Sequence, residues 1–221
     1  MKTHSQLSII IVTWNTADIT LKCVQSIKKY LKNLNYEIII VNNASTDDTV
    51  TKLKKEGGVV IVENESNLGF GGGNNAGAAV AKGEYLLFLN SDMELTEKSK
   101  MIDSLIRHLE DNPETGIITP KLMLGNGKLD PACHRGEPSL LDVFFYFSGF
   151  EKLFPKIKFF TKYHMLYKDF STMHEVDAVT GACMLMKNDI LEKIGYFDER
   201  FFMYSEDMDL CRRFRLAGYK I

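Results

Sequence analysis

The stretch EYLLFLNSD, residues 84–92, decides the fold. Its five consecutive apolar residues, 85–89, predict a strand that is buried on both faces, as strands of parallel sheets are. The run stops at Asn90, Ser91 and Asp92. Because ligands bind at the carboxyl ends of strands in open α/β sheets, Asn90 and Asp92 are placed to hold a hard divalent cation, directly or through water. The alternative is that these residues simply begin a turn.

Two similar units precede this stretch. Buried strands are predicted at residues 7–12 and 37–41, and each ends in polar side chains. Each strand is followed by a helical pattern, which ends near residue 31 in the first unit and near residue 56 in the second. A further strand is predicted at 59–62. Strands that alternate with helices predict a parallel, doubly wound α/β sheet.

A glycine-rich stretch, NLGFGGGNNAG, follows at residues 67–77. Its glycines would let the backbone approach a diphosphate or a nucleotide sugar closely, and the alanine-rich residues 78–81 are expected to form the helix after it. Residues 71–76 also satisfy the dinucleotide pattern G-x-G-x-x-A, with Asp92 as the ribose-binding acid. That pattern normally turns directly from strand to helix, whereas residues 64–68 intervene here.

The middle of the chain predicts an amphipathic helix, a short strand and a hairpin. The helix is expected at 96–111, the strand at 117–120 and the hairpin at 124–135. Residues 176–186 are expected to form a strand, a break at Gly181 and a second strand, with Asp177 and Gly181 facing a ligand. A helix is predicted at 188–194.

Residues 140–170 differ in character, because aromatic residues alternate there with lysines. Such a mixture suits a surface that contacts anionic lipid or a lipid-linked acceptor. The alternative is a helical hairpin whose aromatic side chains pack on the core. Asp142, Glu151 and Asp169 dilute the positive charge, so the sequence alone leaves both interpretations open.

Three carboxylates, Glu206, Asp207 and Asp209, occur where a last helix is expected to start. They can offset the helix dipole, with Ser205 as the cap and Asp209 paired with Arg213. One of them can instead act as a general base. Crowding by like charges and partial burial among the aromatic residues at 201–204 would raise its proton affinity.

The composition argues against several classes of protein. The 221 residues carry a formal net charge of −2, so no basic field points to nucleic acid. Four scattered cysteines suggest reduced thiols, since no CxxC pair is present. There is no leader peptide pattern, and no apolar run reaches the roughly 18 residues that span a bilayer. We expect one cytoplasmic domain, soluble or peripheral on the inner face of the membrane.

Six ordered motifs together resemble the family-2 glycosyltransferases with the GT-A fold, in particular their bacterial rhamnosyltransferase-like branch. The resemblance spans residues 7–221 and rests on IIIVTWN (9–15), IIIVNNASTDDT (38–49), NLGFGGGNNAG (67–77), YLLFLNSD (85–92), VTGACMLMK (179–187) and GYFDERFFMYSEDMDLCRRFRLAGY (195–219). It implies a Rossmann-like, mostly parallel central sheet flanked by helices. It also implies one domain over 1–221, with a nucleotide-sugar-binding half (1–95) and an acceptor and catalytic half (96–221).

The resemblance also implies roles for individual residues. Asp207 matches the catalytic base, and Glu206 and Asp209 would orient the base or the acceptor. Asn90 replaces the first carboxylate of the family's DxD-type element, so Asp92 is the expected ligand of Mg²⁺ or Mn²⁺. The residues expected to contact the nucleotide sugar are Thr13, Asn15, Asn42, Asn43, Asp47, Asn67, Gly69, Phe70, Asn74, Asn90 and Ser91.

The implied reaction is an in-line displacement with inversion at the sugar. Asp207 would deprotonate an acceptor hydroxyl, and the donor would be a dTDP- or UDP-sugar, with rhamnose as a candidate sugar. The acceptor would be a cell-surface polysaccharide or a lipid-linked glycan. Relatives continue beyond residue 221 to a histidine that completes the metal site, so we expect a truncated chain. The alternatives are a non-catalytic nucleotide-sugar-binding module and, from the glycine pattern, an NAD-dependent oxidoreductase.

Overall fold

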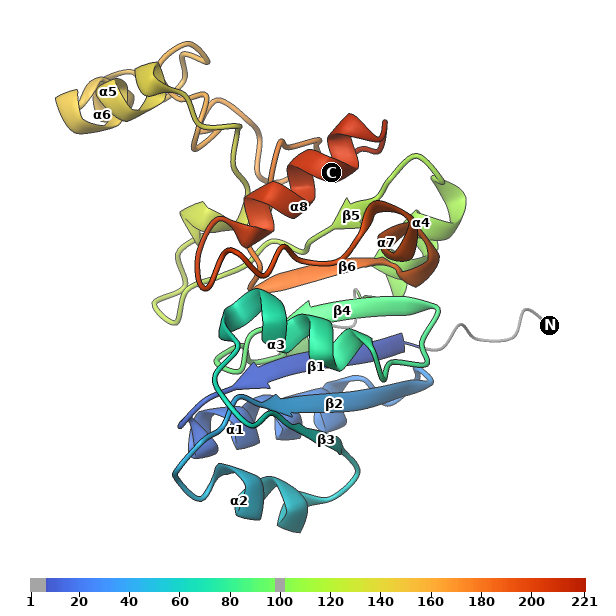
Figure 1. Ribbon diagram of the computed structural model, residues 1–221. Helices are drawn as coiled ribbons and strands as arrows, with labels where there is room; N and C mark the ends of the chain where they lie inside the picture. Colours follow the sequence, from blue (N-terminus) through green and yellow to red (C-terminus); the bar gives the residue numbers. More distant parts are fainter. Residues whose placement is uncertain (1–6, 98–101) are drawn as a thin grey trace.

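The computed structural model describes residues 7–97 and 102–221, which form a six-stranded sheet between two layers of helices (Figure 1). The strands, in sheet order, are β3 (Val60–Glu63), β2 (Tyr36–Asn42), β1 (Leu7–Thr13), β4 (Tyr85–Leu89), β6 (Cys183–Lys187) and β5 (Ile117–Ile118). β1 pairs in parallel with β2 and β4, and β2 with β3, whereas β6 is antiparallel to both of its neighbours. The prediction of a mostly parallel α/β sheet flanked by helices is confirmed.

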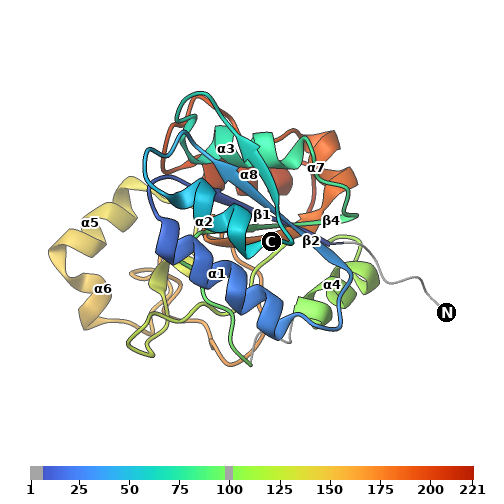
Figure 2. The same ribbon diagram turned by 90° about the horizontal axis from the view of Figure 1, so that it is seen from below.

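Each central strand is buried on both faces because helices cover both sides of the sheet (Figures 1 and 2). Ile9 and Ile11 of β1 pack in a core with α1 (Ala17–Tyr30), α2 (Thr49–Glu56) and α4 (Ile102–Asp111). Ile10 points the other way, into a core with α3 (Gly69–Ala78), α7 (Asn188–Ile194) and α8 (Glu206–Leu216). The period of two along a strand therefore produces two cores from one apolar run.

The expected helix over the alanine-rich residues 78–81 is wrong in its position, because all five glycines of the preceding stretch lie inside α3 and the helix ends at Ala78. A Cβ on Gly77 would lie 2.5 Å from Ile10 Cγ2, and one on Gly73 would lie 2.8 Å from Val12 Cγ1. The helix packs on β1 too closely for any side chain at these positions. Gly71 lies within the helix and not in a strand-to-helix turn, so the glycines do not have the geometry of a dinucleotide fingerprint.

Other expectations are confirmed in part. The chain turns between Leu124 and Lys128, whose backbone groups bond at 2.8 Å, as the predicted hairpin requires. Helix α4 begins at Ile102, and positions 98–101 of the predicted helix lie outside the described residues. The prediction of two strands within 176–186 is wrong for the first, because Ala178 makes only an isolated bridge with Arg135.

Residues 140–153 form two helices that extend away from the sheet in both views (Figures 1 and 2). They are α5 (Leu140–Ser148) and the single-turn α6 (Phe150–Leu153), joined by Gly149 in the left-handed conformation. In the part of the chain that the structure describes, no helix is long and apolar enough to cross a bilayer. All four cysteines are free and buried.

The packing of α3 on β1 generates a stability prediction for Gly77→Ala. The new Cβ would meet Ile10 and Val41, so the helix must shift away from the sheet. We expect urea unfolding to show a loss of about 1–3 kcal/mol, although helix propensity alone favours Ala over Gly by about 1 kcal/mol. Gly125→Ala is the control, because nothing lies within 4 Å of a Cβ there. Equal effects of the two substitutions would contradict the close packing.

Candidate active site

The carboxyl ends of β1 and β2 are joined by a network that contains five predicted nucleotide-site residues. Asn15 accepts the backbone N–H of Thr46 on its Oδ1 at 2.8 Å. Asp47 accepts the N–H and the hydroxyl of Thr49, and the Thr49 hydroxyl bond in particular holds the Asp47 pKa below its usual value. Asn15 and Asp47 are exposed, so this edge presents an amide and a carboxylate to a ligand.

Thr13, Asn42 and Asn43 lie at the same edge but are buried. The Asn43 amide donates to Gly69 O at 2.9 Å, and its Oδ1 accepts from Asn64. Asn42 Oδ1 accepts the N–H of Ser45, while the Thr13 hydroxyl bonds within the protein to Thr16 and Thr20. These three side chains therefore shape the loops, whereas Asn15 and Asp47 are exposed at the same edge.

Backbone strain concentrates around this region. Among the described residues, five that are not glycine have positive φ, and four of them flank the predicted site. They are Asn15 (φ 53°), Ala44 (φ 59°), Tyr204 (φ 69°) and Ser205 (φ 73°). Such conformations cost about 1–3 kcal/mol each and persist where surrounding structure enforces them, commonly at ligand sites. Ser205 precedes α8 as predicted, but its side chain makes no capping hydrogen bond.

The start of α3 connects the nucleotide edge to the acidic segment before α8. Asn67 Oδ1 accepts the N–H of Gly69 at 2.9 Å, and Asn74 donates to Phe70 O at 3.0 Å. The Phe70 N–H donates to Phe202 O at 3.0 Å. Gly69 has φ 75°, and a Cβ there would lie 2.1 Å from that same carbonyl, so only glycine fits.

Residues 181 and 182 connect the end of β4 to the start of α8. The Asn90 N–H, just beyond β4, donates to Ala182 O at 3.0 Å. The preceding residue, Gly181, donates its N–H to Asp207 Oδ2, also at 3.0 Å. Two consecutive residues thus hold the Asn90-Ser91-Asp92 element beside Asp207, although 115 residues separate Asp92 from Asp207 (207 − 92).

Arg135 is a site residue that the sequence analysis missed. Its Nη2 donates to Asp207 Oδ2 at 2.5 Å and to Val179 O at 3.1 Å. Both side chains of the ion pair are largely buried, with 14% and 11% exposure. Asp207 Oδ1 also accepts the N–H of Met208 at 2.7 Å, so three donors fix the carboxylate. The pair spans 72 residues, and no local motif marks Arg135.

The other two carboxylates have different surroundings. Glu206 is 5% exposed, and its Oε2 has no hydrogen-bond partner among the described residues. Burial, helped by the negative charge of Asp207, raises the Glu206 pKa above its usual value. Of the aromatic residues expected to bury it, Phe202 and Tyr204 are themselves exposed and Phe201 is half-buried. Asp209 pairs with Arg213 at 2.8 Å, which confirms the expected ion pair within α8.

Asp92 is exposed at the end of β4, and Asn90 and Ser91 are half-buried beside it. The described residues contain no cluster of three His, Cys, Asp or Glu side chains that would bind a metal without help. Mg²⁺ is commonly held by one or two carboxylates together with substrate phosphates. A single exposed carboxylate with neighbouring amide and hydroxyl oxygens fits a site of that kind, in which the phosphates of a bound ligand supply the remaining oxygens.

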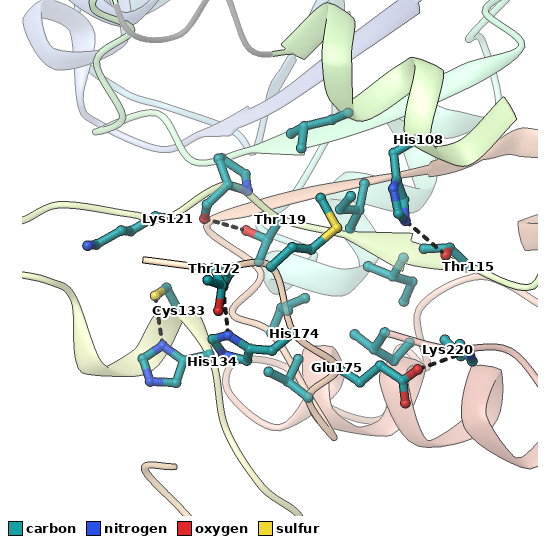
Figure 3. Close-up of a pocket in the computed structure, with 18 of the residues that line it drawn as sticks. His108, Thr115, Thr119, Lys121, Cys133, His134, Thr172, His174, Glu175 and Lys220 are labelled. Atoms are coloured by element: carbon teal, nitrogen blue, oxygen red, sulfur yellow. Dashed lines mark hydrogen bonds and ion pairs between the residues drawn. The ribbon is translucent and has the colours of Figure 1, made fainter. Parts of the chain in front are cut away.

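A separate cavity of about 590 Å³ lies among α4, β5 and residues 170–176 (Figure 3). Its polar groups contact one another: His108 Nε2 lies 3.3 Å from Thr115 Oγ1, and Lys220 pairs with Glu175 at 3.0 Å. Burial lowers the pKa of His134, which favours the neutral ring. None of the predicted nucleotide, metal or catalytic residues lines this cavity, so it is distinct from the candidate active site.

Replacing Arg135 with methionine tests whether the buried ion pair is structurally required. Removing one partner leaves the Asp207 carboxylate buried without its counter-ion, so we expect the free energy of unfolding to fall by about 3 kcal/mol. The double variant with Asp207→Asn should recover part of this loss. Arg107→Met, which breaks the exposed pair with Asp103, is the control and should cost about 0.5 kcal/mol or less. Similar losses at both arginines would contradict the assignment.

The buried Glu206 carboxyl generates a pH prediction. Its raised pKa means that the folded protein binds this proton more tightly than the unfolded chain does. The stabilisation is therefore complete below the usual pKa of 4.5 and is lost as pH rises through the raised value. We expect Glu206→Gln to unfold at higher urea than the wild type at pH 7 but not at pH 4. The exposed Glu65→Gln should change neither midpoint, and a wild-type advantage at pH 7 would overturn the prediction.

Comparison with known proteins identifies the family. The sequence model of glycosyl transferase family 2 matches residues 8–195. The O-antigen biosynthesis protein RfbC of Myxococcus xanthus is 27% identical over 98% of this chain and 16% of its own length. The low-salt glycan biosynthesis hexosyltransferase Agl10 of Haloferax volcanii is 27% identical over 97% of this chain and 63% of its own length. The N-acetylglucosaminyl-diphospho-decaprenol L-rhamnosyltransferase of Mycobacterium tuberculosis is 27% identical over 82% of this chain and 62% of its own length.

Solved structures agree on the fold. The mannosyltransferase PcManGT of Pyrobaculum calidifontis, in complex with GDP-Man and Mn²⁺, superposes with a TM-score of 0.67 at 16% identity, over 99% of this chain and 54% of that one. The S. aureus TarS complex with UDP-GlcNAc superposes with a TM-score of 0.64 at 17% identity, over 98% of this chain and 55% of that one. The chain spans between 16% and 63% of the length of the three curated relatives above. The predicted GT-A fold is confirmed, and the chain belongs to glycosyl transferase family 2.

Proposed function

We propose that the protein is an inverting glycosyltransferase that moves a sugar, rhamnose being our candidate, from a dTDP- or UDP-sugar to a cell-surface polysaccharide or lipid-linked glycan. The observation that carries the proposal is the double attachment at Gly181 and Ala182, whose backbone groups bond to Asp207 and to Asn90. A candidate base and a candidate metal ligand thereby lie at the same edge of the sheet as the strand ends of β1 and β2.

The donor would bind across the ends of β1, β2 and α3. Asn15 and Asp47 offer an exposed amide and carboxylate for the base and ribose, and the neighbouring Trp14 is 53% exposed and offers a stacking surface. Asn67, Gly69 and Phe70 would line the diphosphate and sugar pocket. The nucleotide-sugar-binding half would be residues 1–95, and residues 96–221 would supply the acceptor side. PcManGT with GDP-Man and TarS with UDP-GlcNAc support a nucleotide-sugar donor.

Asp207 would remove the proton of the acceptor hydroxyl as that oxygen attacks the anomeric carbon. The three hydrogen bonds to its carboxylate fix the orientation that a general base requires. Arg135 is then a positioning residue. Glu206, whose buried Oε2 has no hydrogen-bond partner in the described part of the chain, would orient the base or the acceptor. Asp209, one turn of helix α8 from Arg213, would have the same role.

Asp92, with Asn90 and Ser91 beside it, would hold Mg²⁺ or Mn²⁺ against the diphosphate. A bound divalent cation would stabilise the charge that develops on the leaving nucleoside diphosphate. The Mn²⁺ in the PcManGT complex supports this use of a divalent cation. The rival proposal, a module that binds the nucleotide sugar without turnover, follows from the amide of Asn90 at the first position of the Asn90-Ser91-Asp92 element, where a carboxylate would bind a cation more strongly.

Calorimetry with UDP, dTDP, GDP and NAD, each with and without Mn²⁺, tests the proposal. We expect UDP or dTDP to bind in a Mn²⁺-dependent manner, because Asp92 and the diphosphate share the cation. Asp92→Ala should weaken that binding and remove its dependence on Mn²⁺. Binding of NAD alone, indifferent to Mn²⁺, would overturn the proposal.

Asp207→Asn is the matched variant in the same experiment. It should keep nucleotide affinity close to the wild-type value, because the carboxylate serves the acceptor hydroxyl. Donor turnover should fall by about a hundred- to ten-thousandfold, which is the usual contribution of a general base. Full nucleotide binding by the wild type without any donor turnover would favour the non-catalytic module.

A further inference from the structure

The segment 139–168, named the helical hairpin from here on, has a small core of its own. Phe145 is 7% exposed, and its ring centroid lies 5.1 Å from Phe159 and 5.0 Å from Phe160. Phe160 in turn stacks on Phe150 at 5.6 Å. None of residues 140–160 belongs to either core of the sheet. The aromatic rings of the segment therefore pack around Phe145 and on one another, and not in the cores of the sheet.

The outer surface of the helical hairpin is apolar. Leu140 is 90% exposed, Phe147 82% and Leu153 69%. The other exposed apolar side chains of the same segment are Leu141, Val143, Phe144, Tyr146, Phe150, Phe154, Ile157 and Phe159. An apolar surface of this kind, on an element that extends from the domain (Figures 1 and 2), is typical of a docking site.

The charges of the helical hairpin separate by sign. Asp142 is buried and accepts the N–H and hydroxyl of Ser139 in a capping box. Glu151 is also buried, and its Oε1 lies 2.6 Å from His164 Nδ1. The exposed charged residues of the segment are all lysines: Lys152, Lys156, Lys158 and Lys162. Two of the three acids that dilute the charge in the sequence, Asp142 and Glu151, are thus withdrawn from the surface, and the third, Asp169, is exposed just beyond the segment.

We propose that the helical hairpin is a docking surface for an anionic lipid bilayer. The exposed aromatic and aliphatic side chains enter the interface, and the lysines contact the anionic head groups. A second copy of the chain fits this surface less well, because a two-fold contact would bring the four exposed lysines of one copy toward those of the other. Charge complementarity selects an anionic surface.

The base of the helical hairpin is attached to the candidate active site. The Gly136 N–H donates to Tyr163 O at 2.7 Å, and a Cβ on Gly136 would lie 2.3 Å from Lys162 O. The adjacent Arg135 forms the ion pair with Asp207. Docking would therefore hold the Asp207 side of the site near the bilayer. This last step rests on the proposed function, because it identifies the acceptor as one carried by a membrane lipid.

Vesicle flotation tests the docking surface without nucleotide or acceptor. The full chain is mixed with phosphatidylcholine vesicles, or with vesicles that contain about one third phosphatidylglycerol. We expect binding to the anionic vesicles that weakens as salt is added. Phe147→Ser combined with Leu153→Ser should reduce the partition coefficient about tenfold or more. Lys152→Gln combined with Lys156→Gln should reduce it about fivefold per lysine on anionic vesicles.

Matched controls lie outside the helical hairpin. Leu216→Ser removes a 78% exposed leucine from α8, and Lys55→Gln removes an exposed lysine from α2. Both should float like the wild type. Calorimetry with UDP and dTDP in the absence of vesicles checks that every variant is folded, and it also tests the proposed function separately. If the wild type bound neither UDP nor dTDP, the proposed transferase function would be overturned. The flotation result would still decide the proposed docking surface.

Three results would overturn the docking surface. The first is a wild type that floats with neither kind of vesicle. The second is hairpin variants that float as well as the two controls. The third is a concentration-dependent dimer in sedimentation that both hairpin variants abolish, which would assign the surface to a second copy.

Discussion

The candidate site depends on one constraint, which is that residues 181 and 182 bond to two different elements at once. Gly181 donates to Asp207, and Ala182 accepts from Asn90. Glycine is required at 181, because a Cβ there would lie 2.8 Å from the ring of Phe70. The close approach of Phe70 also brings the start of α3 to the same point. A larger residue at 181 would therefore displace the ring of Phe70, which lies between the proposed nucleotide side of the site and Asp207 on the proposed catalytic side.

The sheet was predictable from sequence because its signals are local. The apolar runs of β1, β2 and β4 must be buried on both faces, and that requirement alone places helices on both sides. The glycine stretch was misassigned because tertiary packing overrides helix propensity: α3 tolerates its glycines only because β1 lies so close. The first strand expected in 176–186 was wrong for a similar reason, since Ala178 bonds to Arg135 and not to the sheet.

The site was predictable only where a residue ends a strand or belongs to an ordered motif. Asn90 and Asp92 follow a buried run, and Asp207 lies in an acidic segment, so each has a local mark. Arg135 has none, because its partner lies 72 residues away. The surface charge of the helical hairpin could not be predicted for a related reason. Asp142 and Glu151 are charged residues in the sequence, but the fold buries both. Long-range pairing and burial are properties of the fold, and composition does not contain them.

The start of α8 combines features that each oppose stability. Tyr204 and Ser205 have positive φ. Within residues 7–97 and 102–221, the Ser205 side chain makes no capping bond and the buried Oε2 of Glu206 has no hydrogen-bond partner. Selection for stability alone would remove the positive φ angles, the missing cap and the buried oxygen, because a single substitution can correct each of them. The Arg135–Asp207 pair fixes the first turn of α8, and Arg213, which pairs with Asp209 within the helix, also donates to the carbonyls of Gly195 and Tyr196. The strain is therefore localised next to Asp207, where the proposed general base would need a fixed orientation more than the helix needs an ideal start.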